Sequence, residues 1–343
     1  MTASDYLRVD AFMRTLVDAR ALKTAFETRL VDRLIGVSSL GVETLRSELK
    51  LDRPALDLLL DMLAASRVVT RDGGGAVALA ADFRAALAYR DLLEAKLDFA
   101  GFLAADFLEG FTLLLADPEA FKKQSRLFEL FDYRRCFESG VDNYERTKTW
   151  MRLTTMLTKY ESRACMELHD FSGYRRVLDV GGNSGELVLR LCKAHPELRA
   201  TVMDLPLVCE IGLEHILSEP ERSRIAFLKG DVRKDPLPGG FDLISFKSML
   251  HDWPEADAAR LLARAAAALE PGGGILIFER GPMRFDGQAI PFSLLPTLLF
   301  FRSYREPAVY ARQLEALGLR DVETRQVLLD TPFFVVSARK ASS

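Results

Sequence analysis

The sequence has few residues of the types that hold a structural metal. None of its four cysteines stands in a CxxC motif, and no two of its four histidines have the spacing of a metal-ligand pair. The cysteines are Cys136, Cys165, Cys192 and Cys209, and the histidines are His169, His195, His215 and His251. We therefore expect free thiols and no bound metal.

The sequence also lacks an excess of charge of either sign and a long apolar run. Its 46 basic and 49 acidic residues leave a net charge of -3, which excludes the strong basic field of a nucleic-acid-binding protein. The longest strongly apolar stretch, residues 291–301, is too short to cross a bilayer, and the N-terminus lacks the apolar core of a signal peptide. We expect a cytoplasmic protein that binds neither nucleic acid nor a membrane.

The most informative segment is residues 177–186, VLDVGGNSGE, in which an apolar strand runs into a glycine-rich turn. Its spacing is Asp179-x-Gly181-x-x-x-Gly185, which differs from the GxGxxG turn that binds the pyrophosphate of a dinucleotide. An acid at the strand tip repels a pyrophosphate but favours a cation, and S-adenosylmethionine carries an ammonium and a sulfonium. The turn therefore predicts a methyl-donor site, and the alternative is a purely structural connection.

Two more apolar segments end in an acid. Residues 200–204 end at Asp204, about twenty residues past the turn, where a doubly wound fold places the carboxylate that accepts ribose hydroxyls. Residues 225–228 precede Asp231. Further strands are predicted at residues 241–246, 275–279, 322–328 and 333–338, with helices at 187–194 and 307–317. This alternation predicts an α/β fold, a Rossmann-like domain with a mostly parallel sheet and helices on both faces.

The N-terminal part predicts a winged helix. Apolar residues at helical spacing over residues 10–36, 45–49 and 54–65 precede a hairpin that turns through three glycines near residue 74. The supposed recognition helix, residues 54–66, has two acids and no lysine or arginine, so it cannot neutralise phosphates. We expect a dimerisation domain at residues 1–100, an aromatic-rich helical linker and substrate-pocket region at 101–172, and the α/β domain at 173–343.

A candidate catalytic group follows the strand at residues 241–246. There His251, Asp252 and Trp253 are consecutive, just past a strand end. A neutral imidazole, with a pKa of about 6.5, can take a proton from a phenol or enol while a methyl group arrives. Glu279 ends the next strand and can hold one ring nitrogen, as the orienting acid does in a catalytic triad. The alternative is structural, with Asp252 capping a helix that begins at Pro254.

These motifs together resemble a known family. They are DVGGNSG at 179–185, MDLPLV around Asp204, GDV at Asp231, FKSMLHDWP at 246–254 and PGGGILIFE ending at Glu279. Over nearly its whole length the chain resembles the O-methyltransferases that include the caffeate and acetylserotonin enzymes and many bacterial natural-product enzymes. The resemblance implies a winged-helix dimerisation domain, a homodimer, S-adenosylmethionine as donor with S-adenosylhomocysteine as product, and a hydroxyl of an aromatic or polyketide-like small molecule as acceptor.

The resemblance also assigns roles to individual residues. It implies that Gly181 and Gly182 bind the methionine part of the donor and Asp204 its ribose, and that His251 is the general base oriented by Glu279. It places Asp231 and Val232 beside the adenine, Trp253 near the adenine, and Lys247 near the catalytic side. The other residues implied in cofactor binding are Asp179, Gly185 and Leu205.

The chain departs from the family at one position that bears on the base. Tyr304 precedes Arg305 where the family often has a second glutamate, so either Glu306 replaces it through a shifted backbone or His251 relies on Glu279 alone. Asn183 in place of a usual third glycine is milder, since asparagine tolerates the left-handed conformation.

Several alternatives stay open at this point. The acceptor atom can be carbon or nitrogen instead of oxygen, and some relatives bind the donor but perform decarboxylation or hydroxylation. A different class of protein, a DNA-binding regulator with the methyl donor as effector, requires the basic recognition helix that residues 54–66 lack.

Overall fold

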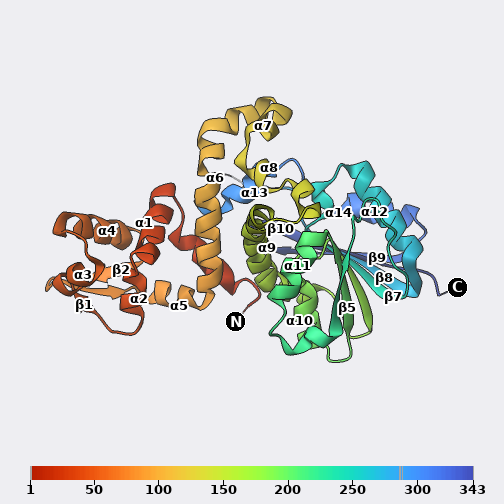
Figure 1. The fold of residues 1–343 in the computed structure, drawn as a ribbon, viewed down its shortest axis with the longest axis horizontal. Coiled ribbons are helices and arrows are strands. Elements are labelled where there is room, and N and C mark those ends of the chain that lie inside the picture. Colours follow the sequence, from red (N-terminus) through yellow and green to blue (C-terminus); the bar gives the residue numbers. More distant parts are fainter. Residues whose placement is uncertain (1, 286, 288, 343) are drawn as a thin grey trace. The chain divides into compact units, whose positions relative to one another are not determined.

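The computed structural model describes residues 2–285, 287 and 289–342. The chain divides into two compact units, each with parts from two stretches of sequence. One unit comprises Met1–Glu129 with Phe285–Leu299, and the other comprises Leu130–Arg284 with Phe300–Ser343. Figure 1 shows the first unit in red to yellow, with its later helix α13 (Leu295–Leu299) in blue, and the sheet-containing second unit mostly in green to blue.

The first unit is mostly helical and contains a small three-stranded sheet in the order β1-β3-β2. Helix α1 begins with a capping box in which Thr15 and Asp18 bond to each other's backbone N–H groups. Its elements are η1 (Asp5–Phe12), α1 (Leu16–Glu27), α2 (Leu30–Ile35), β1 (Leu40–Gly41), α3 (Val42–Leu49), α4 (Arg53–Ala65), β2 (Val69–Arg71), β3 (Ala76–Leu79), α5 (Ala81–Ala86), η2 (Leu87–Tyr89), α6 (Arg90–Ala116), α7 (Pro118–Gln124), α8 (Arg126–Leu130), η6 (Phe292–Leu294) and α13 (Leu295–Leu299).

The predicted order of helices followed by a hairpin is present in this unit. Helix α4, the supposed recognition helix, packs against α1 and β2. It buries one apolar face, which consists of Leu56, Leu59, Leu60 and Leu63. Burial of this leucine face favours a packing role for α4, and the role of the unit in dimerisation stays a prediction.

One helical stretch of this unit, Ala81–Ala116, is long and apolar enough to cross a membrane by length and composition alone. The core helix of a soluble protein meets the same criterion. Two buried charged side chains of the stretch have partners within the unit, as a core helix requires. Lys96 donates to Asp10 at 2.8 Å, and Asp106 accepts from Ser125 Oγ at 2.5 Å.

The second unit is built on a seven-stranded sheet in the order β6-β5-β4-β7-β8-β10-β9. Neighbours from β6 to β8 pair in parallel, while β10 is antiparallel to both β8 and β9. The predicted α/β class with a mostly parallel sheet is therefore confirmed. The strands are β4 (Arg176–Val180), β5 (Arg199–Asp204), β6 (Ile225–Lys229), β7 (Phe241–Lys247), β8 (Leu269–Arg280), β9 (Arg320–Leu328) and β10 (Pro332–Arg339).

Helices cover both faces of this sheet. Helices α12 and α14 enclose one buried core with strand residues such as Leu178, Ile244 and Phe246. Figure 1 shows α9, α10 and α11 on the opposite side of the sheet. The helices are η3 (Tyr133–Phe137), α9 (Val141–Leu168), α10 (Glu186–Ala194), α11 (Pro206–His215), η4 (Pro220–Arg224), η5 (Leu250–Asp252), α12 (Glu255–Ala268) and α14 (Pro307–Ala316).

The strand order places a ligand site. From β4 the chain continues outward through β5 to β6 and then returns to β7 on the other side of β4, so the order reverses between β4 and β7. In open parallel sheets, ligands bind outside the carboxyl ends of the strands at such a reversal. Most of the predicted site residues lie at the ends of β4, β5 and β7 or just after them, while Asp231 and Val232 follow β6 and Glu279 lies near the end of β8.

Candidate active site

The glycine turn after β4 is held tightly against its neighbours. Asp179 is almost wholly buried and accepts a hydrogen bond from Ser245 Oγ of β7 at 2.7 Å. Gly181, Asn183 and Gly185 have positive φ angles of 67°, 55° and 74°, so Asn183 adopts the left-handed conformation expected of it. A Cβ at Gly182 would lie 2.6 Å from Asp179 Oδ2, which explains a glycine there.

The acid at the end of β5 is tied to the same turn. Asp204 Oδ2 accepts the backbone N–H of Asn183 at 2.8 Å, and Oδ1 accepts that of Leu205. Burial raises the pKa of Asp179 to about 7 and that of Asp204 to about 6. Because their hydrogen-bond donors are neutral, both carboxyl groups favour a cationic ligand that stabilises their charged forms.

The third acid, Asp231, has a different environment. Its carboxylate accepts hydrogen bonds from Nε and Nη2 of Arg233, both at 3.0 Å. The guanidinium carbon of Arg233 lies 4.6 Å from the centre of the Trp253 ring, a cation–π arrangement. Val232 is buried in the core that α12 covers. The structure thus brings together Asp231, Val232 and Trp253, which the resemblance assigns to the adenine, and adds Arg233 to them.

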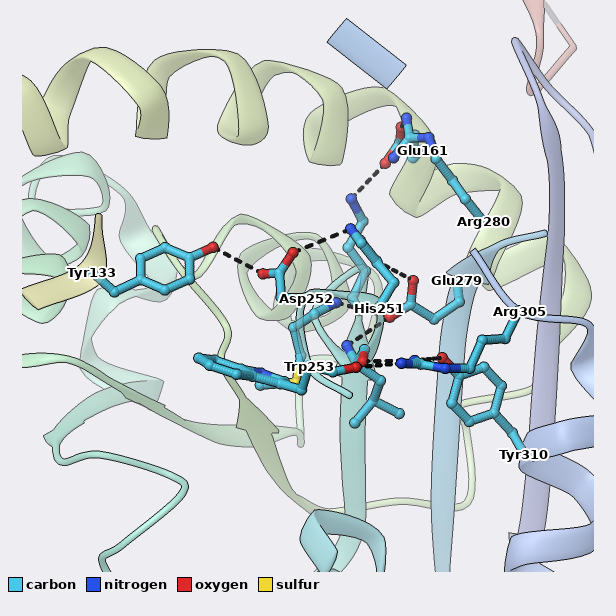
Figure 2. A network of polar contacts seen from close by, with 12 residues as sticks. Tyr133, Glu161, His251, Asp252, Trp253, Glu279, Arg280, Arg305 and Tyr310 are labelled. Atoms are coloured by element: carbon cyan, nitrogen blue, oxygen red, sulfur yellow. Dashed lines mark hydrogen bonds and ion pairs between the residues drawn. The ribbon is translucent and has the colours of Figure 1, made fainter. Parts of the chain in front are cut away.

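The predicted contact between His251 and Glu279 is present. Glu279 is fully buried near the end of β8, and its Oε2 lies 2.7 Å from Nδ1 of His251. Its Oε1 accepts the backbone N–H groups of Met249 and Leu250 at 2.9 and 2.8 Å. Since a carboxylate only accepts, Nδ1 carries a proton and Nε2 keeps its lone pair in the neutral ring. Figure 2 shows the imidazole held in this way.

The capping interpretation of Asp252 is wrong. Helix α12 begins at Glu255 without a side-chain cap. The 3-10 turn η5 instead directs the Asp252 carboxylate toward Tyr133, whose hydroxyl donates to Oδ2 at 2.8 Å. The other oxygen, Oδ1, lies 3.4 Å from Nε2 of His251 (Figure 2). Asp252 is therefore a site residue that sequence reasoning missed, although its position next to His251 was a signal.

The imidazole of His251 has a carboxylate near each ring nitrogen. Burial by itself lowers the pKa of His251, but Glu279 and then Asp252 outweigh burial and raise this pKa above its ordinary value. A general base must be neutral to accept a proton, so the base form of His251 is gained as the pH rises through this raised pKa.

A buried ion network surrounds Lys247, the last residue of β7. Glu161 of α9 is fully buried, and its two oxygens accept from Lys247 Nζ at 2.5 Å and from Arg280 Nη2 at 2.6 Å. Lys247 also donates to Thr158 Oγ1 at 3.0 Å. Neither Glu161 nor Arg280 lies in a motif that identifies it from sequence. The implied contact of Lys247 with a donor stays a prediction.

Glu306 does not replace the family's second glutamate. Its side chain is about half exposed and accepts a hydrogen bond from Arg284 at 2.9 Å. Tyr304 lies beside the base instead, with its ring centre 5.2 Å from that of His251. Of the two alternatives, the structure favours the one in which Glu279 alone orients Nδ1.

Comparison with known proteins identifies the family. A profile of the O-methyltransferase domain matches residues 114–287. The chain belongs to this O-methyltransferase family. The resemblance predicted from the five motifs is therefore confirmed.

Individual relatives agree with this assignment. The chain is 43% identical to a 3-hydroxy-5-methyl-1-naphthoate 3-O-methyltransferase of Streptomyces sahachiroi over 147 residues, 43% of this chain and 41% of the relative. It is 30% identical to the demethylspheroidene O-methyltransferase of Cereibacter sphaeroides over 265 residues, 77% of this chain and 67% of the relative. The chain spans about half or less of the length of most curated relatives it matches.

Solved structures share the fold over nearly the whole chain. The mitomycin 7-O-methyltransferase superposes with a TM-score of 0.70 at 24% identity, covering 94% of each chain. At this identity the likeness shows the fold alone, and it confirms the Rossmann-like domain with a helical N-terminal region.

The buried Glu161 predicts a pH-dependent contribution to stability. Lys247 and Arg280 outweigh burial and lower the pKa of Glu161 to about 2. An acid with a lowered pKa stabilises the fold above its unfolded-state pKa, and this contribution is lost as the pH falls toward 2. Glu161→Gln should therefore lower the free energy of unfolding by about 3 kcal/mol at pH 7 and by less at pH 3, as urea unfolding can measure.

Glu167→Gln is the matched control for this variant. Glu167 lies on the same helix but is exposed and paired with Arg163, so its replacement should cost less than about 0.5 kcal/mol. An equal loss for Glu161→Gln at both pH values would show that the contribution of Glu161 is packing instead of charge.

Proposed function

We propose that the protein is an S-adenosylmethionine-dependent methyltransferase that methylates a hydroxyl of an aromatic or polyketide-like small molecule, with His251 as general base. The observation that carries the proposal is the largely buried imidazole that Glu279 holds by Nδ1 at 2.7 Å. The segment before this imidazole packs on the glycine turn, where a Cβ at Gly181 would meet Met249. Membership of the O-methyltransferase family supports the reaction type.

The residues at the strand ends fit the proposed donor. At Gly181 the positive φ and the close approach of Met249 Cε, 2.8 Å from where a Cβ would lie, both require glycine. In the proposal the backbone of Gly181 and Gly182 binds the methionine part. Asp204 suits the ribose hydroxyls, with Leu205 beside it, and Asp179 suits the positive charge of the donor. A buried indole N–H of Trp253, without a partner among the described residues, is suited to a ligand at the adenine end. When bound, the donor supplies a methyl group activated by a sulfonium.

His251 removes the proton of the acceptor hydroxyl. In this proposal Nε2 takes the hydroxyl proton as the oxygen attacks the methyl carbon, and Glu279 stabilises the imidazolium that forms. The hydroxyl oxygen gains the carbon bond, and the sulfur of the donor leaves with the electron pair. Alignment of oxygen, carbon and sulfur provides most of the remaining acceleration.

Aromatic rings near the base support the acceptor class. Tyr304 and Phe300 have ring centres 5.2 and 6.5 Å from that of His251, and Phe131 packs edge-on against Phe300 at 5.7 Å. Such rings pack favourably with a planar aromatic molecule. The relative from Streptomyces sahachiroi is named for a hydroxynaphthoate, which belongs to this class.

The assembly and location of the protein are also part of the proposal. The family resemblance implies a homodimer, and we propose that it works in the cytoplasm. Exposed apolar side chains on α4 and α6 of the first unit are candidates for such an interface, since burying them against a second copy would remove apolar surface from water. They are Leu58, which is 63% exposed, Leu108, which is 67% exposed, and Leu115, which is 49% exposed.

Methyl transfer from [methyl-³H]S-adenosylmethionine to a panel of phenols that includes 3-hydroxy-1-naphthoates tests the function. The wild type should label at least one phenol on oxygen. His251→Ala should lower kcat by roughly 10²-fold or more, since general-base catalysis is lost, and should leave S-adenosylhomocysteine affinity nearly unchanged. Wild-type turnover in this variant would remove His251 from the mechanism, and label on carbon or nitrogen would change the acceptor class.

Donor binding gives a separate prediction. Asp204→Asn should weaken the binding of S-adenosylhomocysteine about tenfold or more in calorimetric titration, because a charge-assisted pair of hydrogen bonds is lost. Asp170→Asn is a control at an exposed carboxylate whose hydrogen bonds with described residues are those from Ser172 in the local turn, and it should bind as the wild type does. Equal affinity of the two variants would mean that the ribose site lies elsewhere.

Arg233 bonds to Asp231 and stacks on Trp253, two residues to which the proposal assigns the adenine. The guanidinium of Arg233 therefore competes with the adenine for these two residues. Only the protein molecules in which Arg233 has moved away can bind the donor, so the apparent affinity is lower than the intrinsic one. Arg233→Ala should tighten S-adenosylhomocysteine binding roughly threefold to tenfold. Lys234 lies 3.6 Å from Asp231, and its ring contact is with Phe137 instead of Trp253, so Lys234→Ala should change the affinity little. Weaker binding by Arg233→Ala would mean that Arg233 contacts the bound donor.

A further inference from the structure

Tyr133 connects the segment before α9 with the base. It begins the short helix η3 and lies 119 residues before Asp252, to which its hydroxyl donates at 2.8 Å. Its ring packs against the rings of Trp150 and Trp253, with centres 5.9 and 6.1 Å away. These ring contacts hold the Tyr133 ring in place and fix the direction of its hydroxyl, so the donor of the hydrogen bond to Asp252 is held rigidly.

The Asp252 carboxylate uses its two oxygens for different partners. Oδ2 accepts from Tyr133, and Oδ1 faces Nε2 of His251 at 3.4 Å. Burial and the neighbouring carboxylate raise the pKa of Tyr133 well above its ordinary value, so the phenol keeps its proton and donates it at neutral pH. A carboxylate held by one oxygen cannot rotate freely, and the other oxygen stays beside the imidazole.

We propose that Tyr133 is a positioning residue that anchors Asp252, so that Asp252 Oδ1 stabilises the imidazolium formed when His251 takes the proton of the acceptor. This inference rests on the proposed role of His251 as general base. Nδ1 of the imidazolium is held by Glu279 and Nε2 faces Asp252, so both protonated nitrogens have a carboxylate partner. Asp252 Oδ1 then stabilises the positive charge of the imidazolium at Nε2, as Glu279 does at Nδ1.

The charged and titratable groups around His251 come from several elements. Glu279 of β8 and Asp252 of η5 raise its pKa, and Arg280 of β8 lowers it. Tyr304 contributes a neutral ring. Loss of the Tyr133 hydroxyl frees Asp252 to turn away from Nε2, which lowers the pKa of His251 and moves the acid limb of the activity profile to lower pH. A purely structural role for Tyr133 would not move this limb.

Histidine ring signals in NMR titrations test the inference without an acceptor. The chain has four histidines, and His251→Gln identifies the signal of His251. Tyr133→Phe, which keeps the aromatic ring, should lower the pKa of His251 by about half a unit, and Asp252→Asn should lower it by about one unit. Combining the two should add nothing to Asp252→Asn alone, because Tyr133 acts through Asp252.

Tyr144→Phe is the matched control. Its hydroxyl also donates to a carboxylate of the second unit, Glu214 of α11 at 2.5 Å. The carboxylates that raise the pKa of His251 are Glu279 and Asp252, so this variant should leave the His251 titration unchanged. An unchanged His251 pKa in Tyr133→Phe, or an equal drop in the Asp252→Asn background, would overturn the inference.

Turnover and donor binding separate this inference from the proposed function. If the proposed function holds, Tyr133→Phe should lower kcat several-fold, shift the acid limb to lower pH and leave KM nearly unchanged. A wild type that binds no S-adenosylhomocysteine contradicts the proposed function, whereas intact binding and turnover with an unmoved acid limb in Tyr133→Phe contradicts only the role of Tyr133.

Discussion

The buried carboxylate of Glu279 is the interaction on which the geometry of the site depends. A carboxylate at the end of a central strand loses its hydration, and burial alone would raise its pKa. The His251 ring and nearby backbone N–H groups outweigh burial and lower the pKa of Glu279 instead. Because Met249 and Leu250 supply two of these donors, the same contacts fix the turn η5 and the directions of His251 and Asp252. The contacts of the Glu279 carboxylate therefore fix the position of the segment that carries His251 and Asp252.

The other buried acids of the site are compensated in unequal ways. Glu161 has two cationic partners and Asp231 has Arg233. Among the described residues, the hydrogen-bond donors to Asp179 and Asp204 are neutral, and burial raises the pKa values of these acids to about 7 and about 6. A ligand that brings positive charge gains most at the second pair, which agrees with the proposed sulfonium donor.

Much of the site was predictable because it follows from local rules. The left-handed Asn183 depends on the turn alone, and the contact between His251 and Glu279 follows from two neighbouring parallel strands that end at the same edge. The sequence predicts a strand that begins at residue 275, whereas β8 begins at Leu269. Its glycine-rich start has a turn-like sequence but pairs with β7 and β10.

The residues that sequence reasoning missed lie far away in the chain or depend on side-chain direction. Glu161 is 86 residues from Lys247, and Tyr133 is 119 residues from Asp252, so only the packing of α9 and η3 brings these partners together. The capping alternative for Asp252 is wrong because the 3-10 turn directs the carboxylate to Tyr133.

The most direct test of this account is the tautomer of His251, measured from its ring nitrogen shifts by NMR at a pH above its pKa. The account predicts that the proton is on Nδ1, held by Glu279, and that Nε2 is the free acceptor that can take a proton. A neutral ring with its proton on Nε2 would contradict the account, because the group assigned to remove the acceptor's proton would have no lone pair with which to do so.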